Sequence, residues 1–350
     1  MGLARGVFMV DTHVHAQRHA YGVSSREDAS AEYRSLARSM WTIDPYDNSE
    51  RLLWHMDKYG VDVCVLQPAF AMTNVINKQI KEKFPNRFVL WADDVETRRK
   101  DAEGVAPWTI DAALEEIERE LETGLYCGIG EGLPGDLKGL PPGGWPERFE
   151  QICKTMELCR KYKVVAPYHC GAVSGYGNGG GGGPYADQHD RSNVFLAGQV
   201  ASHYPDVPII IQHAGIEGSG YSTDMYEDCL TVARSNHNIY LETGQWWAEL
   251  YERPLKDPNI GCERLVWGTD WGSSIPQSWM PGCVPETFCN QDINAGLPAH
   301  QIDIFGWSLR ELGRLNIPQD DLNLILGGNA CRIMNIKTPF TRLFKQYIKK

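Results

Sequence analysis

Near the start of the chain lies Val7-Phe8-Met9-Val10-Asp11-Thr12-His13-Val14-His15, an apolar run of strand length that ends in two histidines. Further runs rich in Val, Ile, Leu and aromatic residues follow at 61–70, 87–94, 126–132, 164–170, 207–214, 239–243 and 264–270. Because these runs are almost continuously apolar, each predicts a strand that is buried on both faces.

Amphipathic helical patterns separate several of these runs. Segment 109–123 places apolar residues at helical spacing, and Gly124 follows it where a C-cap is expected. Segments 146–162 and 193–204 show the same pattern, and Pro146 suits a first helical turn. The alternation of eight strands with helices predicts an α/β protein with a parallel sheet. A closed (β/α)8 TIM barrel is a simpler solution than an open, doubly wound sheet.

We expect residues 1–350 to form a single barrel domain, because no interior linker divides the chain. Two long irregular segments interrupt the alternation, at 171–184 after the fifth strand and at 273–301 after the eighth. In a barrel both lie at the carboxyl end of the strands, where loops build binding and catalytic sites.

Composition excludes several classes of function. The chain has 34 Lys and Arg against 45 Asp and Glu, a formal charge of −11, and no basic stripe, so we expect no binding to nucleic acid. No apolar run reaches the roughly 20 residues that cross a bilayer, and the start of the chain lacks the pattern of a signal peptide, so we expect no membrane contact. The 10 cysteines are scattered without a Cys-x-x-Cys pair, which predicts reduced thiols in a cytoplasmic protein.

Several of the predicted strands end in side chains that bind metal ions. His13 and His15 are two residues apart on the first strand, so their side chains project to the same side. The other strand ends of this kind are Glu131 on the fourth, His169 on the fifth, His213 on the sixth and Asp270 on the eighth. A barrel brings strand ends together, and imidazoles and carboxylates buried there without partners are strongly unfavourable. A divalent cation pairs them, so the pattern predicts a metal site.

With these residues in place, the chain resembles the amidohydrolase superfamily. The resemblance rests on the segment 11–15, on the histidines that end the fifth and sixth strands, on Gly268-Thr269-Asp270-Trp271 and on Gly327-Gly328-Asn329-Ala330-Cys331-Arg332. More narrowly, the chain is similar to the amidohydrolase-related (amidohydrolase 2) branch, which includes the aminocarboxymuconate semialdehyde and γ-resorcylate decarboxylases. The likeness extends from about residue 8 to about residue 336.

The resemblance implies roles for the strand-end residues. His13, His15 and Asp270 would hold a metal ion, and His169 would ligate the same ion or a neighbour. His213 would be a ligand of a second metal or a general acid/base. In hydrolytic members, Asp270 accepts the proton of the attacking water; in decarboxylating members, the metal orients the carboxylate of the substrate. The implied cofactor is one or two divalent cations (Zn, Mn or Fe), and the expected substrate is a small organic molecule with a carboxylate.

Glu131 departs from the simplest mononuclear members, which need no carboxylate at the end of the fourth strand. The segment Ile129-Gly130-Glu131-Gly132 resembles the TatD-type nucleases, and a carboxylate there can bridge two cations and take part in catalysis. Two metals would suit an O2-activating Fe or Mn hydroxylase, and the chain also resembles the two-component 2-aminoisobutyrate hydroxylase type. The alternative is that Glu131 accepts a hydrogen bond from a ligand histidine.

Three functions therefore remain open from the sequence. The first is metal-assisted hydrolysis or decarboxylation, and the second is oxygenation by a dinuclear monooxygenase, one subunit of a two-component enzyme. The third is a scaffold subunit whose metal is structural. In each case we expect the chain to associate with itself or with a related chain, because exposed barrel helices commonly pair.

Overall fold

Parallel strands in two four-stranded sheets make up the centre of the molecule. The computed structural model describes residues 7–19, 45–69, 72–136, 138–170, 190, 193–216, 225–272 and 304–337. The first sheet has the order β1 (Val10–Val14), β4 (Val63–Leu66), β5 (Phe88–Ala92) and β6 (Tyr126–Ile129). The second has the order β10 (Leu265–Val266), β9 (Ile239–Glu242), β8 (Ile209–Gln212) and β7 (Ala166–His169).

The two sheets meet along both of their edges. Val14 pairs with Trp271 on one side, and Gly128 pairs with Val165 on the other, each as an isolated parallel bridge. The backbone N–H of His15 also donates to the carbonyl oxygen of Trp271, 2.7 Å away. The ladder is not continuous around the ring, because single bridges rather than full ladders join the sheets. The strand order still follows the chain, as the predicted (β/α)8 fold requires.

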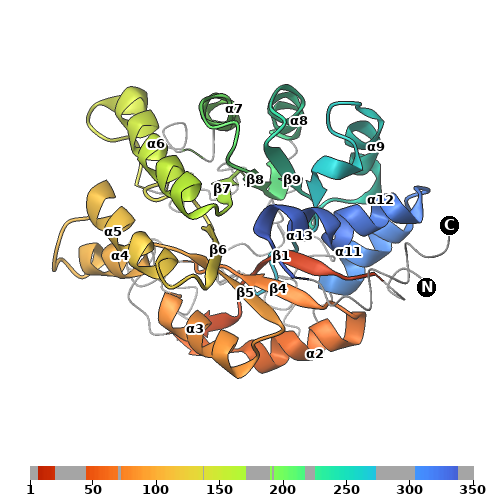
Figure 1. Cartoon of the computed structure of the whole chain (residues 1–350), viewed down its shortest axis with the longest axis horizontal. Helices are drawn as coiled ribbons and strands as arrows, with labels where there is room; N and C mark the ends of the chain where they lie inside the picture. Colours follow the sequence, from red (N-terminus) through yellow and green to blue (C-terminus); the bar gives the residue numbers. More distant parts are fainter. Residues whose placement is uncertain are drawn as a thin grey trace, which may run out of the picture.

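Helices surround the strands (Figure 1). In Figure 1, α6 to α9 lie on one side of the molecule, and α2 and α3 lie on the opposite side. The helices are α2 (Ser49–Tyr59), α3 (Asn74–Lys83), α4 (Val95–Ala102), α5 (Ile110–Leu121), α6 (Gly144–Tyr162), α7 (Val194–His203), α8 (Tyr226–Ser235), α9 (Ala248–Lys256), α11 (Ile304–Gly313), α12 (Gln319–Asn323) and α13 (Asn329–Met334). In the part of the chain that the structure describes, none of them combines the length and apolar composition needed to span a bilayer.

The strands and helices predicted from sequence are present with shorter bounds, except that α6 begins two residues before the predicted 146–162. α5 begins after Thr109, whose hydroxyl accepts a hydrogen bond from the N–H of Ala112, 3.2 Å away. It ends at Leu121, and Gly124 adopts a φ of +70° three residues later. A short antiparallel pair, β2 (Gln17–His19) and β3 (Pro45–Asp47), was not predicted, because three residues are too few to show a period. The two long irregular segments lie outside the described residues.

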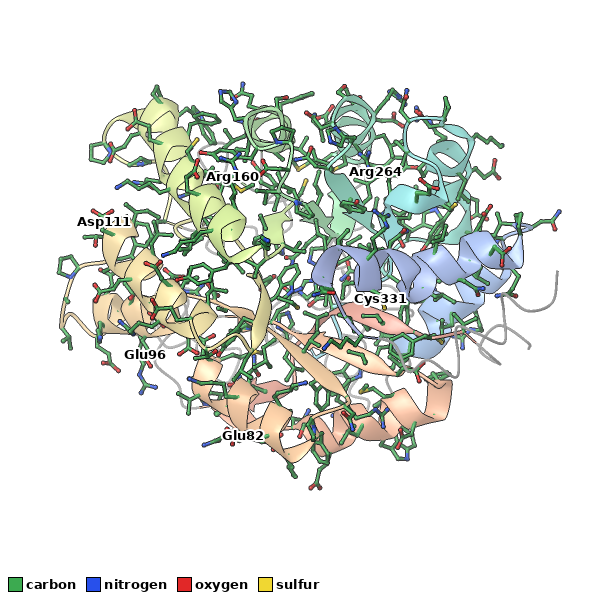
Figure 2. The ribbon with its side chains drawn as sticks, viewed as in Figure 1. Glu82, Glu96, Asp111, Arg160, Arg264 and Cys331 are labelled. Atoms are coloured by element: carbon green, nitrogen blue, oxygen red, sulfur yellow. The ribbon has the colours of Figure 1, made fainter. Side chains whose placement is uncertain are left out.

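The interior of the barrel is apolar at the end where the strands begin. One buried cluster contains Val10, Val65, Trp91, Val165, Ile210 and Val266 together with Ala330 and Met334 of α13. Cys331, labelled on α13 in Figure 2, packs against the same cluster. α13 therefore closes this end of the barrel and leaves the opposite end for polar side chains.

Asn329 attaches α13 to the strands. Its Nδ2 donates to the carbonyl oxygens of Cys262 and Leu265, each 2.8 Å away. Arg332 donates to Asn329 Oδ1 at 2.9 Å and to the hydroxyl of Tyr240 at 3.0 Å. The Gly-Asn-Ala-x-Arg segment therefore has a structural role, because its hydrogen bonds hold α13 against the end of the barrel.

Asn329→Ala should lower the free energy of unfolding by about 1–3 kcal/mol, because two buried carbonyl oxygens lose their donor. The shift of the urea midpoint measures this loss. Asn323→Ala, which removes a hydrogen bond from Gln319 at the surface of α12, is the control and should change stability by less than about 0.5 kcal/mol. Equal shifts for the two variants would contradict the assignment.

Candidate metal centre

His13 and His15 face each other at the end of β1. Their Nε2 atoms are 3.1 Å apart, and both rings are buried. The Nδ1 of His15 lies 2.9 Å from the carbonyl oxygen of Gln67, and the Nδ1 of His13 lies 3.0 Å from Glu242 Oε2. When both rings are neutral, each Nδ1 donates to an oxygen, and the lone pairs of both Nε2 atoms then point to the same place.

Asp270 completes this group from the segment that follows β10. Its Oδ1 lies 3.0 Å from His15 Nε2 and 3.5 Å from His13 Nε2. The φ of Asp270 is +57°, a left-handed conformation that Asp adopts more readily than most residues. This backbone turn places the Asp270 carboxylate beside the two histidines. Gln245 donates from Nε2 to Oδ2 of the same carboxylate at 3.3 Å. The three candidate ligand atoms of His13, His15 and Asp270 lie within 4.8 Å of one another.

The remaining predicted residues adjoin this group. Candidate ligand atoms of His13, Glu131 and His213 also lie within 4.8 Å of one another. His169 Nε2 is 2.9 Å from Glu131 Oε1, and the rings of His169 and His213 are 4.7 Å apart between centroids. The structure thus brings all the strand-end residues singled out from the sequence into one cluster, at the end of the barrel opposite α13.

The donors of this cluster fit a divalent cation. Two imidazole Nε2 atoms and a carboxylate oxygen converge, and within the described residues His213 Nδ1 is buried without a hydrogen-bond partner. A buried polar atom without a partner is unfavourable, and a ligand that accepts its lone pair would remove that penalty. Nitrogen and oxygen donors without thiolate suit Zn, Mn or Fe.

Comparison with known proteins identifies the family. Residues 10–336 match the amidohydrolase family. The chain belongs to this family. No curated protein matches it.

Solved structures of other amidohydrolase-fold proteins are similar over almost the whole chain. A probable 2-pyrone-4,6-dicarboxylic acid hydrolase from Acinetobacter baumannii, with citric acid bound, has a TM-score of 0.54 and 13% identity, covering 94% of this chain and 99% of that one. The 5-carboxyvanillate decarboxylase from Sphingomonas paucimobilis has a TM-score of 0.54 and 14% identity, with 95% and 100% covered. An amidohydrolase from Burkholderia multivorans with bound zinc has a TM-score of 0.51 and 10% identity, with 94% and 100% covered. At these identities the likeness establishes the fold.

The electrostatics of this member of the amidohydrolase family favour a cation in the cluster. Burial opposes a charge on His13, yet the carboxylates of Glu242 and Asp270 outweigh burial and raise the pKa of His13 to about 10. Burial likewise opposes ionisation of both carboxylates, but the charge on His13 holds the pKa of each below its ordinary value. Burial lowers the pKa of His213, which therefore stays neutral. Without metal, His13 holds a proton that a cation would displace.

Glu242, which is not among the residues predicted from the sequence, is buried at the end of β9. Its Oε2 accepts hydrogen bonds from His13 Nδ1 at 3.0 Å and from the backbone N–H of His213 at 3.1 Å. The signal was present in Ile239-Tyr240-Leu241-Glu242-Thr243, where a carboxylate interrupts an apolar run. A carboxylate in a buried strand needs specific partners, so it deserved the same weight as the strand-end histidines.

Asp11 joins β1 to the segment after β10 beneath the cluster. Its Oδ1 accepts from the backbone N–H groups of His13 and Thr269, both at 3.0 Å. Its Oδ2 accepts from the hydroxyl of Thr269 at 2.6 Å. Burial raises the pKa of Asp11 from 3.8 to about 7 despite these hydrogen bonds.

Asp11→Asn should change how the stability of the metal-free protein depends on pH. Because the pKa of Asp11 is raised in the folded state, its contribution to the free energy of unfolding is largest below about pH 4 and decreases as the pH rises to about 7. Asparagine does not titrate. The free energy of unfolding of the variant, compared with that of wild type, should therefore rise by on the order of 4 kcal/mol between pH 4 and pH 7. Urea unfolding at a series of pH values measures this difference. For the exposed-site control Asp320→Asn, the free energy of unfolding should depend on pH as it does in wild type. The same dependence as wild type in Asp11→Asn would contradict the prediction.

Proposed function

We propose that this protein is a metal-dependent hydrolase or decarboxylase that acts on a small molecule carrying a carboxylate. The observation that carries the proposal is the convergence of His13 Nε2, His15 Nε2 and Asp270 Oδ1 within 4.8 Å at the open end of the barrel. A divalent cation bound there would polarise a substrate oxygen and lower the pKa of a bound water to about 7.

One cation per chain agrees best with the contacts of His13. Its Nδ1 is engaged with Glu242, so only Nε2 can bind a metal. Both groups of candidate ligands include His13, and its Nε2 atom can bind one cation, so one cation at the group of His13, His15 and Asp270 is the simplest arrangement. We therefore assign His13, His15 and Asp270 as ligands and Glu131 as the group that completes the site, and we assign His213 as a general acid/base that does not bind the metal. His169 would hold Glu131 in place.

Asp270 and His213 are the residues that would move protons. Asp270 Oδ2 receives the Gln245 N–H at 3.3 Å while Oδ1 faces the histidines, so the carboxylate is held in position to take a proton from an attacking water. His213 is neutral because burial lowers its pKa, and its Nδ1 can receive a proton and return it to the leaving group or to a carbon that has lost CO2.

The substrate class that we propose is taken from two enzymes of similar fold. The two similar structures named as enzymes of defined substrates act, by their names, on 2-pyrone-4,6-dicarboxylic acid and 5-carboxyvanillate, which both carry carboxylates. These two compounds are the substrates to test first. Loss of the pyrone absorbance reports hydrolysis, and release of CO2 reports decarboxylation. We expect turnover of one compound class that stops when a chelator removes the metal; turnover that persists in protein shown to contain no metal would contradict the proposal.

His13→Ala combined with His15→Ala should abolish both metal binding and turnover, since it removes both Nε2 donors. Elemental analysis after purification without added metal measures the bound metal. The control is His203→Ala combined with His237→Ala, which replaces two exposed histidines and should keep the full metal content. Full metal content in the His13 and His15 double variant would defeat the assignment of these ligands.

An O2-activating Fe or Mn hydroxylase is the second candidate, and Glu131 is the observation that favours it. This carboxylate lies within 4.8 Å of ligand atoms of His13 and His213 and 2.9 Å from His169, a position from which it could bridge two cations. Two iron or manganese ions per chain with consumption of O2 would favour this function, whereas one zinc per chain favours the first. Metal binding without any turnover would favour a scaffold subunit that works with a related chain.

A further inference from the structure

We propose that Glu242 is the positioning residue of this metal centre. Its carboxylate decides which nitrogen of His13 is offered to the metal, and it holds the turn that carries His213. The inference rests on the proposed metal-dependent function and adds to it a residue that binds neither metal nor substrate.

Both oxygens of Glu242 are engaged by the residues of the centre. Oε2 accepts from His13 Nδ1 at 3.0 Å and from the backbone N–H of His213 at 3.1 Å. Oε1 accepts from the hydroxyl of Thr12 at 3.2 Å. The side chain is buried, so water does not compete for these oxygens. Each donor either belongs to a candidate ligand or precedes one directly in the chain.

The contact with Oε2 selects the tautomer of His13. A neutral imidazole carries one N–H, and the carboxylate oxygen at Nδ1 requires that proton there. Nε2 then keeps its lone pair on the side of His15 and Asp270. Without an acceptor at Nδ1 the proton could reside on Nε2, where it blocks metal binding. A carboxylate on the far nitrogen also makes an imidazole a better ligand.

The same oxygen holds the backbone at His213 in an unfavourable conformation. His213 and Ala214 have φ values of +59° and +43°, in the left-handed region that residues with a Cβ avoid. The N–H of His213 donates to Glu242, and its carbonyl accepts from Trp246 Nε1 at 3.2 Å. A single atom, Glu242 Oε2, therefore holds both the ring of His13 on β1 and the turn at His213 after β8.

Gly268 shows how closely this carboxylate is packed. A Cβ at position 268 would lie 2.5 Å from Glu242 Oε1 and 2.5 Å from Thr12 Oγ1, closer than real Cβ contacts. Only glycine leaves room for the carboxylate here. Gly268→Ala therefore displaces the side chains of Glu242 and Thr12 while every candidate ligand keeps its own side chain.

Titration of metal-free protein with Co²⁺ tests the proposal, with the visible absorption of the bound ion as readout. Glu242→Gln keeps an oxygen for His13 and His213, while its amide can donate to the Thr12 hydroxyl, so the change removes only the charge. We expect Co²⁺ to bind about 10-fold more weakly to Glu242→Gln and about 100-fold more weakly to Glu242→Ala. The absorption spectrum should stay that of wild type in Glu242→Gln and change in Glu242→Ala, because only alanine frees the ring of His13.

Gly268→Ala should also weaken Co²⁺ binding about 10-fold, because it moves the carboxylate away from His13. The matched control is Glu116→Gln in the outer helix layer. Glu116 is a buried carboxylate that accepts from the backbone N–H groups of Glu96 and Thr97 and from the Thr97 hydroxyl. This control should lose stability and keep the affinity for Co²⁺.

The possible results separate this inference from the proposed function. If wild type binds Co²⁺ and the Glu242 and Gly268 variants bind it equally tightly, the positioning role is wrong while the metal centre stands. The role is also wrong if Glu116→Gln weakens binding as much as Glu242→Gln. If wild type binds no Co²⁺, the proposed function falls together with this inference. Should Glu242→Ala fail to fold, Glu242→Gln and Gly268→Ala decide the matter.

Discussion

A hydrogen bond of 3.0 Å joins His13 Nδ1 to Glu242 Oε2 across 229 positions of the sequence. Both groups are buried and ionisable, and either one alone would be strongly destabilising in this environment. Together they orient the ring of His13, and the candidate ligands His15 and Asp270 are arranged around its other nitrogen. The geometry of the candidate metal centre therefore depends on this one buried pair.

The residues beneath the centre also join the two sheets at the edge between β1 and β10. Asp11 accepts hydrogen bonds from Thr269, which links the first strand to the segment after the last. His15, a candidate ligand, donates its backbone N–H across the same boundary to Trp271. Closure of the fold and assembly of the centre thus use neighbouring groups, so a substitution here that disturbs metal binding will also disturb stability. Glu116, a buried carboxylate in the outer helix layer, separates these two effects because its loss should disturb stability alone.

Sequence reasoning found the candidate ligands and missed what orients them. His13 and His15 could be recognised because strand alternation places residues two apart on the same side, whatever the surrounding fold. Asp270 and His213 could be recognised by their place at the ends of apolar runs. Glu242 also ends such a run, but its role depends on contacts with His13 and His213, two residues from other strands. The backbone turns at His213 and Asp270 were equally hidden, because a positive φ at a residue other than glycine leaves little trace in the sequence.

The sequence by itself determined the eight strands, several helices and the identity of the polar residues at the strand ends, because these follow from local periodicity and from the exclusion of unpaired polar groups from an apolar interior. The tertiary structure alone decided which of those residues meet, which nitrogen of each histidine is engaged, and that Glu242 supports His13. Such features depend on the distances between strands that are remote in the chain. Those distances are set by barrel closure and by the packing of α13 against the interior, and no local pattern contains them.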